Sequence, residues 1–189
     1  IGWPAPEPLE GFDLMEHGLL CVLSRRLTPT QAEGTLRALR TQYPDWNEPR
    51  VCQVQELAGF IKTKSKDQGI AVSRDIKVFL QAGFQPNHGF DLEFIRDDEA
   101  AGAKFMTQLE FLGTAASHYL LWVASAGAAP VSSGLIRVLD RLGVVARTSS
   151  VKKMRAALEP LVKVEERQRF GLAIGTVVDR YCDPRKPQC

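Results

Sequence analysis

Two cysteines near the end of the sequence are spaced as metal ligands would be. Cys182 and Cys189 lie seven positions apart and flank a loop rich in proline and basic residues. Two thiolates on a rigid loop can form half of a four-cysteine metal or iron–sulfur site. Between them, Arg185 and Lys186 would present positive charge to a phosphate backbone. The pair is incomplete by itself, because such a site needs two more ligands.

A second segment predicts an anion-binding turn between two helices. In Leu109–Val123 an apolar helix ends, Gly113 makes a tight turn, and the next helix begins almost at once. The first N–H groups of that helix lack partners within it, and with the helix dipole they can bind a phosphate. Gly113, Thr114 and Ala115 are therefore candidate DNA-binding residues. The same segment also fits a plain pair of antiparallel helices, which is a common motif.

The rest of the sequence predicts helices almost throughout. Apolar residues repeat with helical spacing from Phe12 onward, and no run alternates as a strand would. Thr28 followed by Pro29 marks a helix start, since a capping hydroxyl precedes proline at the first helical position. We predict an all-α protein of roughly nine or ten short helices. The limits expected for five of them are about 14–25, 70–82, 133–142, 149–161 and 165–180.

A further helix is expected to start at Glu48-Pro49. Its apolar face would hold Val51, Val54, Leu57 and Phe60. The stretch of Lys62, Lys64 and Lys66 that follows is polar and would precede the next helix.

Composition narrows the class of protein. The 189 residues suffice for one domain or for two small lobes, and 44% hydrophobic with 24% charged residues is ordinary for a globular protein. The net charge of +2 creates no global basic field, so any nucleic-acid surface must be a local cluster. Cys21 and Cys52 are expected to be packing residues.

No apolar run of about 18 residues and no signal peptide is visible, so we expect an intracellular protein of the cytoplasm or nucleoid without a membrane partner. The chain begins at Ile1 and ends on a cysteine, and we expect it to be a piece of a longer polypeptide.

The hairpin, the loop and helix of 130–141 and the cysteine tail resemble the helix-hairpin-helix DNA glycosylase superfamily, and endonuclease III in particular. The family hairpin reads Leu-Pro-Gly-Val-Gly, and the run from Phe111 to Ser117 matches it. The family cluster loop opens with Arg-Tyr and Cys, continues through Arg-Lys-Pro and ends on Cys. The stretch from Arg180 to Cys189 reproduces that loop. The sequence Val22-Leu23-Ser24 resembles a Leu-Leu-Ser sequence of the family. In the family this sequence is followed by a Gln that enters the DNA duplex, whereas this chain has Arg26.

The resemblance covers about 12–189 and implies two helical lobes with a cleft between them. One lobe would be 15–127, and the other would combine 1–14 with 128–189. Ser117 and Ser132 would line the cleft, and double-stranded DNA would be the partner; no protein partner is indicated. The resemblance also implies a [4Fe-4S] cluster in the full-length protein, with Cys182 and Cys189 as two ligands and the other two beyond this chain.

Both usual catalytic positions are replaced. The family's bifunctional members use a Lys that forms a Schiff base, but Ser117 stands there, and a hydroxyl cannot form an imine. Where the family has an Asp, this chain has the neutral Ser132. Loss of the negative charge would reduce transition-state stabilisation by on the order of several kcal/mol. Ala115 replaces the second hairpin glycine, which would cost about 1 kcal/mol if the backbone there needed a positive φ.

Three functions are consistent with these observations. The first is a DNA-binding protein without glycosylase or AP-lyase activity that recognises DNA structure or damage. Arg26, Lys64, Lys66, Arg185 and Lys186 would then contact phosphates, although such residues can also be solvated surface charge.

The second is an active glycosylase with relocated catalytic residues, for which Asp97, Asp98, Asp140 and His118 are candidates. Asp140 lies eight residues after Ser132, or about 12 Å along a helix, and a lone histidine such as His118 is usually a packing residue. The third is a protein-interaction module with exposed apolar residues on the side of Trp3 and Trp46.

Overall fold

The structure is a computed structural model in which all regular structure of the described residues is helical, with no strand among them. This confirms the predicted all-α class. The chain divides into two compact units, residues 1–94 and 95–189. The division into one lobe of 15–127 and another of 1–14 with 128–189 stays a prediction. Within the described part, no helix is long and apolar enough to cross a membrane. The described residues are 11–86, 88–97, 99–124, 131–146, 148, 150–182, 185 and 187–188.

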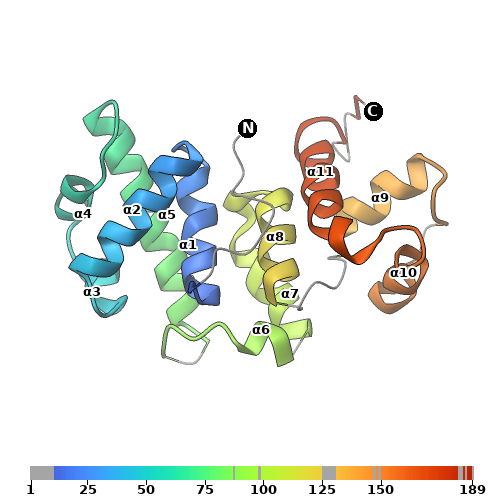
Figure 1. The fold of residues 1–189 in the computed structure, drawn as a ribbon, viewed down its shortest axis with the longest axis horizontal. Coiled ribbons are helices and arrows are strands. Elements are labelled where there is room, and N and C mark those ends of the chain that lie inside the picture. Colours follow the sequence, from blue (N-terminus) through green and yellow to red (C-terminus); the bar gives the residue numbers. More distant parts are fainter. Residues whose placement is uncertain are drawn as a thin grey trace. The chain divides into compact units, whose positions relative to one another are not determined.

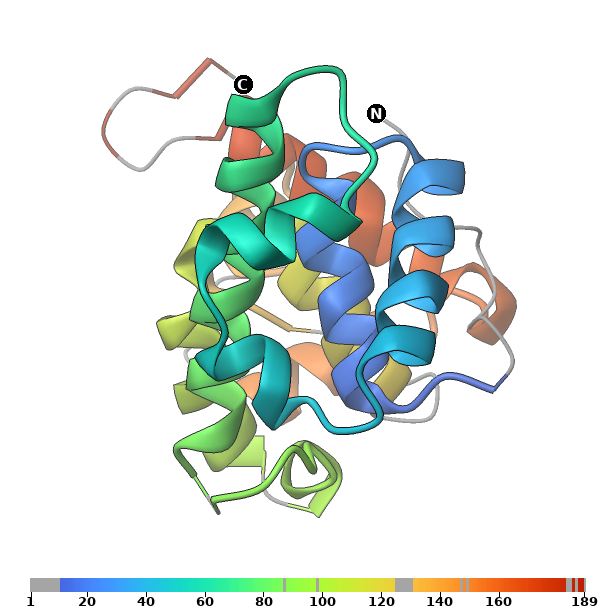
Figure 2. The same ribbon diagram turned by 90° about the vertical axis from the view of Figure 1, so that its left-hand side faces the viewer.

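The first unit is built around a buried helix. Figure 2 shows α1 packed against both α2 and α5. Every residue of α1 from Leu14 to Leu23 is buried, including Cys21, which confirms its packing role. Gly18 has no side chain, and this lets the ring of Phe79 on α5 lie against the α1 backbone. The helices of this unit are α1 (Leu14–Ser24), α2 (Pro29–Gln42), α3 (Asn47–Val51), α4 (Val54–Phe60) and α5 (Lys66–Phe84).

Capping residues set where these helices begin. Thr28 accepts the N–H of Gln31 and precedes Pro29 at the first helical position, as the sequence predicted. Asp13 forms a reciprocal capping box with Glu16 at the start of α1. These bonds satisfy N–H groups that a helix leaves without partners.

Two expectations for this unit are wrong. The helix expected from Glu48 to Phe60 is two helices, because the backbone is extended at Cys52 and Gln53. The continuous apolar face predicted for this helix therefore does not form, and the side chain of Val51, predicted to lie on it, is 62% exposed. The helix expected to start near Ile70 begins at Lys66, because Ser65 caps it by accepting the N–H of Gln68.

The second unit holds α6 (Phe94–Asp97), which begins at the unit boundary, and further helical segments. Figure 1 shows α8 beside α11, and these two helices pack against each other more extensively than any other described pair. The segments after α6 are α7 (Glu99–Gln108), the short 3-10 helix η1 (Glu110–Leu112), α8 (Thr114–Ala124), α9 (Ser133–Arg141), α10 (Val151–Leu158), the 3-10 helix η2 (Val164–Glu166) and α11 (Arg167–Arg180).

Helix α9 is held between α11 and α10. A methyl group on Gly134 would lie 2.6 Å from the side chain of Val178, so glycine allows α9 to approach α11 closely. On the other side, Leu135 and Leu139 pack with Met154 and Leu158 in a buried cluster. The packing fixes the N-terminus of α9, where Ser132 lies.

Candidate functional site

The hairpin between η1 and α8 has the geometry of a tight turn. Gly113 has a φ of +81°, a left-handed conformation that favours glycine. Helix α8 starts at the next residue, Thr114. Ala115 lies within α8, and the only described non-glycine residue with a positive φ is His88. The strain considered for Ala115 is therefore absent.

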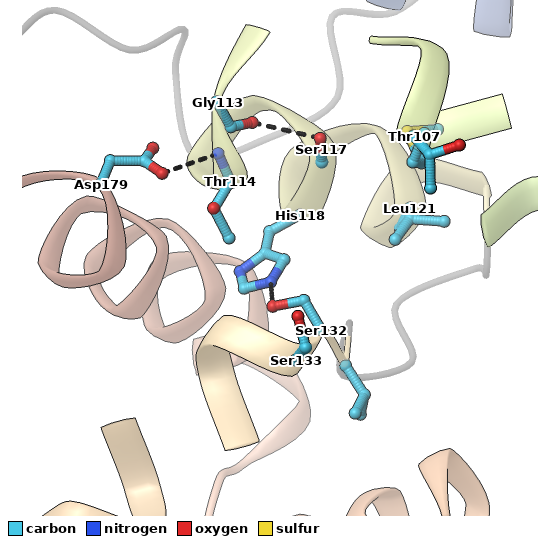
Figure 3. A pocket seen from close by; sticks show the side chains of 11 residues that line it. Thr107, Gly113, Thr114, Ser117, His118, Leu121, Ser132, Ser133 and Asp179 are labelled. Carbon is cyan, nitrogen blue, oxygen red and sulfur yellow. Dashed lines mark hydrogen bonds between the residues drawn. The ribbon is translucent and has the colours of Figure 1, made fainter. Parts of the chain in front are cut away.

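A carboxylate already lies at the N-terminus of α8. Oδ1 of Asp179, on α11, accepts the N–H of Thr114 at 2.9 Å (Figure 3). The other carboxylate oxygen approaches Gly113 so closely that a β-carbon on this glycine would lie 2.9 Å from it. An anion is favoured where unpaired N–H groups and the helix dipole meet. Asp179 therefore uses part of the anion-binding capacity that the sequence assigned to a DNA phosphate.

Ser117 and Ser132, which the sequence resemblance predicted to line a cleft, face one pocket of the second unit. Its volume is about 520 Å³. Ser117 comes from α8 and Ser132 from the start of α9, so the structure brings together two residues that are 15 positions apart (Figure 3). The lining residues are Met106, Thr107, Gly113, Thr114, Ser117, His118, Leu121, Val131, Ser132, Ser133 and Asp179.

The hydroxyls of these serines have different environments. Ser117 donates to the carbonyl of Gly113 at 3.1 Å, one turn earlier in the chain. Ser132 caps α9 by accepting the N–H of Leu135 at 3.1 Å. Neither side chain supplies an amine for a Schiff base or a negative charge.

His118 connects the pocket to α11. The ring is fully buried, as expected of a packing residue. Its Nδ1 lies 3.0 Å from the carbonyl oxygen of Gly171, and its Nε2 lies 2.7 Å from Oγ of Ser132. Burial lowers the pKa of His118 below its ordinary value, and the Gly171 carbonyl and the Asp179 carboxylate oppose this shift. The imidazole is therefore neutral at pH 7.

Asp140, one of the acids considered as relocated catalytic groups, does not line this pocket. Asp140 is exposed near the end of α9, Asp97 ends α6, and Asp98 lies outside the described residues. The lining carboxylate is Asp179. Sequence reasoning missed it because its partner Thr114 is 65 residues away.

The basic candidates lie in different settings. Arg26 forms an ion pair with Asp75 at 2.8 Å, and Arg25 shares the same carboxylate oxygen at 2.9 Å. By contrast, Lys62, Lys64 and Lys66 are exposed, and no ion pair involving them is found within the described part of the chain.

The cysteine tail is partly described. Cys182 is fully buried, and its Sγ accepts a hydrogen bond from Arg141 at 3.0 Å. Iron–sulfur ligands commonly accept such bonds, so Cys182 fits one ligand position. Arg185 is exposed, while Lys186 and Cys189 fall outside the described residues. Among the residues that are described, no three His, Cys, Asp or Glu side chains gather as a metal site would require.

Comparison with proteins of known structure identifies the fold. No protein-family model and no curated protein matches the chain. A trapped endonuclease III–DNA covalent intermediate, an estranged-adenine complex, is similar with a TM-score of 0.55 at 20% identity, covering 96% of this chain and 81% of the other. A non-covalent endonuclease III–DNA complex gives 0.54 at 20% identity, with 96% and 80% covered. The chain thus has the fold of endonuclease III.

Proposed function

We propose that this chain is a DNA-binding protein that recognises DNA structure or damage and has neither glycosylase nor AP-lyase activity. One observation carries the proposal: within an endonuclease III-like fold, Ser117 and Ser132, which the sequence resemblance aligns with the family's catalytic Lys and Asp, line one pocket. A serine hydroxyl cannot form the imine of the lyase reaction. A neutral hydroxyl also cannot stabilise an oxocarbenium-like sugar as a carboxylate does.

DNA binding rests on the fold and on local positive charge. The two similar structures of endonuclease III contain DNA. In this chain Asp179 weakens the hairpin as a phosphate site, so exposed lysines must contribute more of the phosphate contacts. Lys64 and Lys66 are suited to this because they are exposed at the start of α5.

Charge reversal of these lysines tests the binding surface. The variant with Lys64→Glu and Lys66→Glu should bind every duplex sequence more weakly. Its salt slope should be smaller by about 2, because each lysine that neutralises a phosphate accounts for about one. A matched control reverses Lys152 and Lys153, two exposed lysines on α10. An equal weakening in both variants would assign the effect to net charge alone.

One observation favours the alternative of an active glycosylase. Asp179 places a carboxylate at the pocket, although at the hairpin side rather than at Ser132. If it served as the missing anion, wild-type protein would excise bases, and Asp179→Asn would abolish excision. Incubation with duplexes containing oxidised bases separates the two functions, since our proposal expects no product.

The iron–sulfur cluster implied by the cysteine tail is a separate part of the proposal. Cys182 would be one ligand, and the cluster would hold the tail against α9. Protein that contains this chain should contain iron and sulfide and absorb visible light. Colourless, iron-free protein purified without oxygen would contradict this part while leaving DNA binding intact.

A further inference from the structure

The pocket contains a serine and a histidine arranged as a nucleophile and its base. The carbonyl of Gly171 can only accept a hydrogen bond, so the Nδ1 of His118 that lies 3.0 Å from it carries the proton. In a neutral ring, Nε2 is then an acceptor. The hydroxyl of Ser132, 2.7 Å away, therefore donates its proton to His118 (Figure 3).

This arrangement has the three parts of an activated nucleophile. A hydroxyl within hydrogen-bond distance of a base, with the base held by a third group, is the pattern of nucleophilic catalysis. Here the third group is the backbone carbonyl of Gly171, buried on α11. Burial keeps His118 neutral, so it can accept a proton near pH 7.

Ser132 also lies beside hydrogen-bond donors that could stabilise an oxyanion. It is the N-cap of α9, and the N–H of Leu135 is bonded to its side chain. The first two N–H groups of the helix, those of Ser133 and Gly134, have no acceptor within the helix. Donors at a helix N-terminus stabilise negative charge that develops on a substrate oxygen.

We propose that Ser132 and His118 form a catalytic dyad that hydrolyses a neutral carboxylic ester. The pocket volume of about 520 Å³ lies in the range of small-molecule sites. Met106, Leu121 and Val131 give it apolar walls that suit an acyl chain. The carboxylate of Asp179 at the same pocket disfavours anionic substrates. This activity does not depend on DNA binding.

The reaction would proceed in two balanced steps. Oγ of Ser132 attacks the ester carbonyl carbon while Nε2 of His118 takes the hydroxyl proton. The tetrahedral intermediate collapses, the ester C–O bond breaks, and the imidazolium returns the proton to the leaving alkoxide, which departs as an alcohol. Water then gives a proton to Nε2 of His118 and attacks the acyl carbon on Ser132. The bond between this carbon and Oγ breaks, the imidazolium returns the proton to Oγ, and a carboxylic acid leaves the regenerated serine.

Covalent labelling of the wild-type protein tests the dyad. A neutral alkyl fluorophosphonate should phosphonylate Ser132 with loss of fluoride, and peptide mass spectrometry should locate the adduct there. The protein should also hydrolyse p-nitrophenyl butyrate. Replacing His118 with Asn should slow both reactions by about 100-fold or more, as expected for loss of a general base.

Two variants separate chemistry from folding. Ser132→Asn keeps an oxygen that can cap α9, so it should fold, as judged by circular dichroism, and show no labelling. Ser150→Asn is the matched control, because Ser150 caps α10 by accepting the N–H of Lys153 and does not line the pocket. It should label at the wild-type rate. Absence of labelling in folded wild-type protein, or equal labelling of Ser132→Asn, would overturn the dyad and leave Ser132 as a helix cap.

Discussion

Replacing Asp179 with asparagine should increase the affinity of the chain for duplex DNA. The carboxylate lies at the N-terminus of α8 and accepts the N–H of Thr114 at 2.9 Å. A phosphate that approached this amide to within ~4 Å of the carboxylate would be repelled by about 1 kcal/mol in water-like surroundings. Since 1.4 kcal/mol corresponds to a factor of ten, removing the charge should tighten binding about fivefold.

The same substitution should have a small effect on folding. Asparagine keeps an oxygen that can accept the Thr114 N–H, so only the interaction of the charge with the helix dipole is removed. That interaction stabilises by about 0.3–1 kcal/mol, and the low end applies because Asp179 is exposed. The melting temperature should fall by about 1 °C for a chain of this size.

Fluorescence anisotropy with a labelled duplex at low and at physiological salt measures this affinity. The control is Asp140→Asn, which changes the net charge equally at an exposed site near the end of α9. The expected increase in affinity is larger for Asp179→Asn than for the control at both salt concentrations. Equal increases, or weaker binding by Asp179→Asn, would refute the view that this carboxylate competes with phosphate.

The pocket and the tail lead to three further predictions. The double variant with Ser117→Lys and Ser132→Asp should restore borohydride trapping on abasic DNA if the pocket admits a flipped nucleotide. If the double variant forms no adduct, restoring these two groups is not sufficient for the lyase reaction. Because the pKa of His118 is lowered in the folded chain, the unfolded chain binds more protons below about pH 6.5. The free energy of unfolding should therefore fall as pH drops through that range, and urea titrations of wild type and His118→Gln should diverge there. Cys182→Ala should lower the melting temperature, because it leaves a cavity and removes the acceptor of the Arg141 hydrogen bond. An unchanged melting temperature would contradict a contribution of the Cys182 side chain to folding stability.

Local signals in the sequence predicted much of the fold. The helical spacing of apolar residues predicted the limits of α1 and α9 within one or two residues, and the capping pair Thr28-Pro29 predicted the start of α2. The break between α3 and α4 was missed, because Val51, Val54, Leu57 and Phe60 keep helical spacing across it. Nothing in that spacing shows that the backbone becomes extended at Cys52.

The contents of the site were harder to predict. The resemblance brought Ser117 and Ser132 together, and both line the pocket. The hydrogen bonds of His118 with Gly171 and of Asp179 with Thr114 join residues 53 and 65 positions apart. Such interactions depend on how α11 packs against α8, and local sequence patterns do not encode that packing.

The most direct test of the central claim is borohydride trapping with the wild-type chain, run beside a binding measurement on the same abasic duplex. We expect DNA binding that weakens steeply with salt, no covalent adduct and no strand cleavage above background. A trapped adduct would contradict this claim, because an imine requires an amine that neither Ser117 nor Ser132 provides.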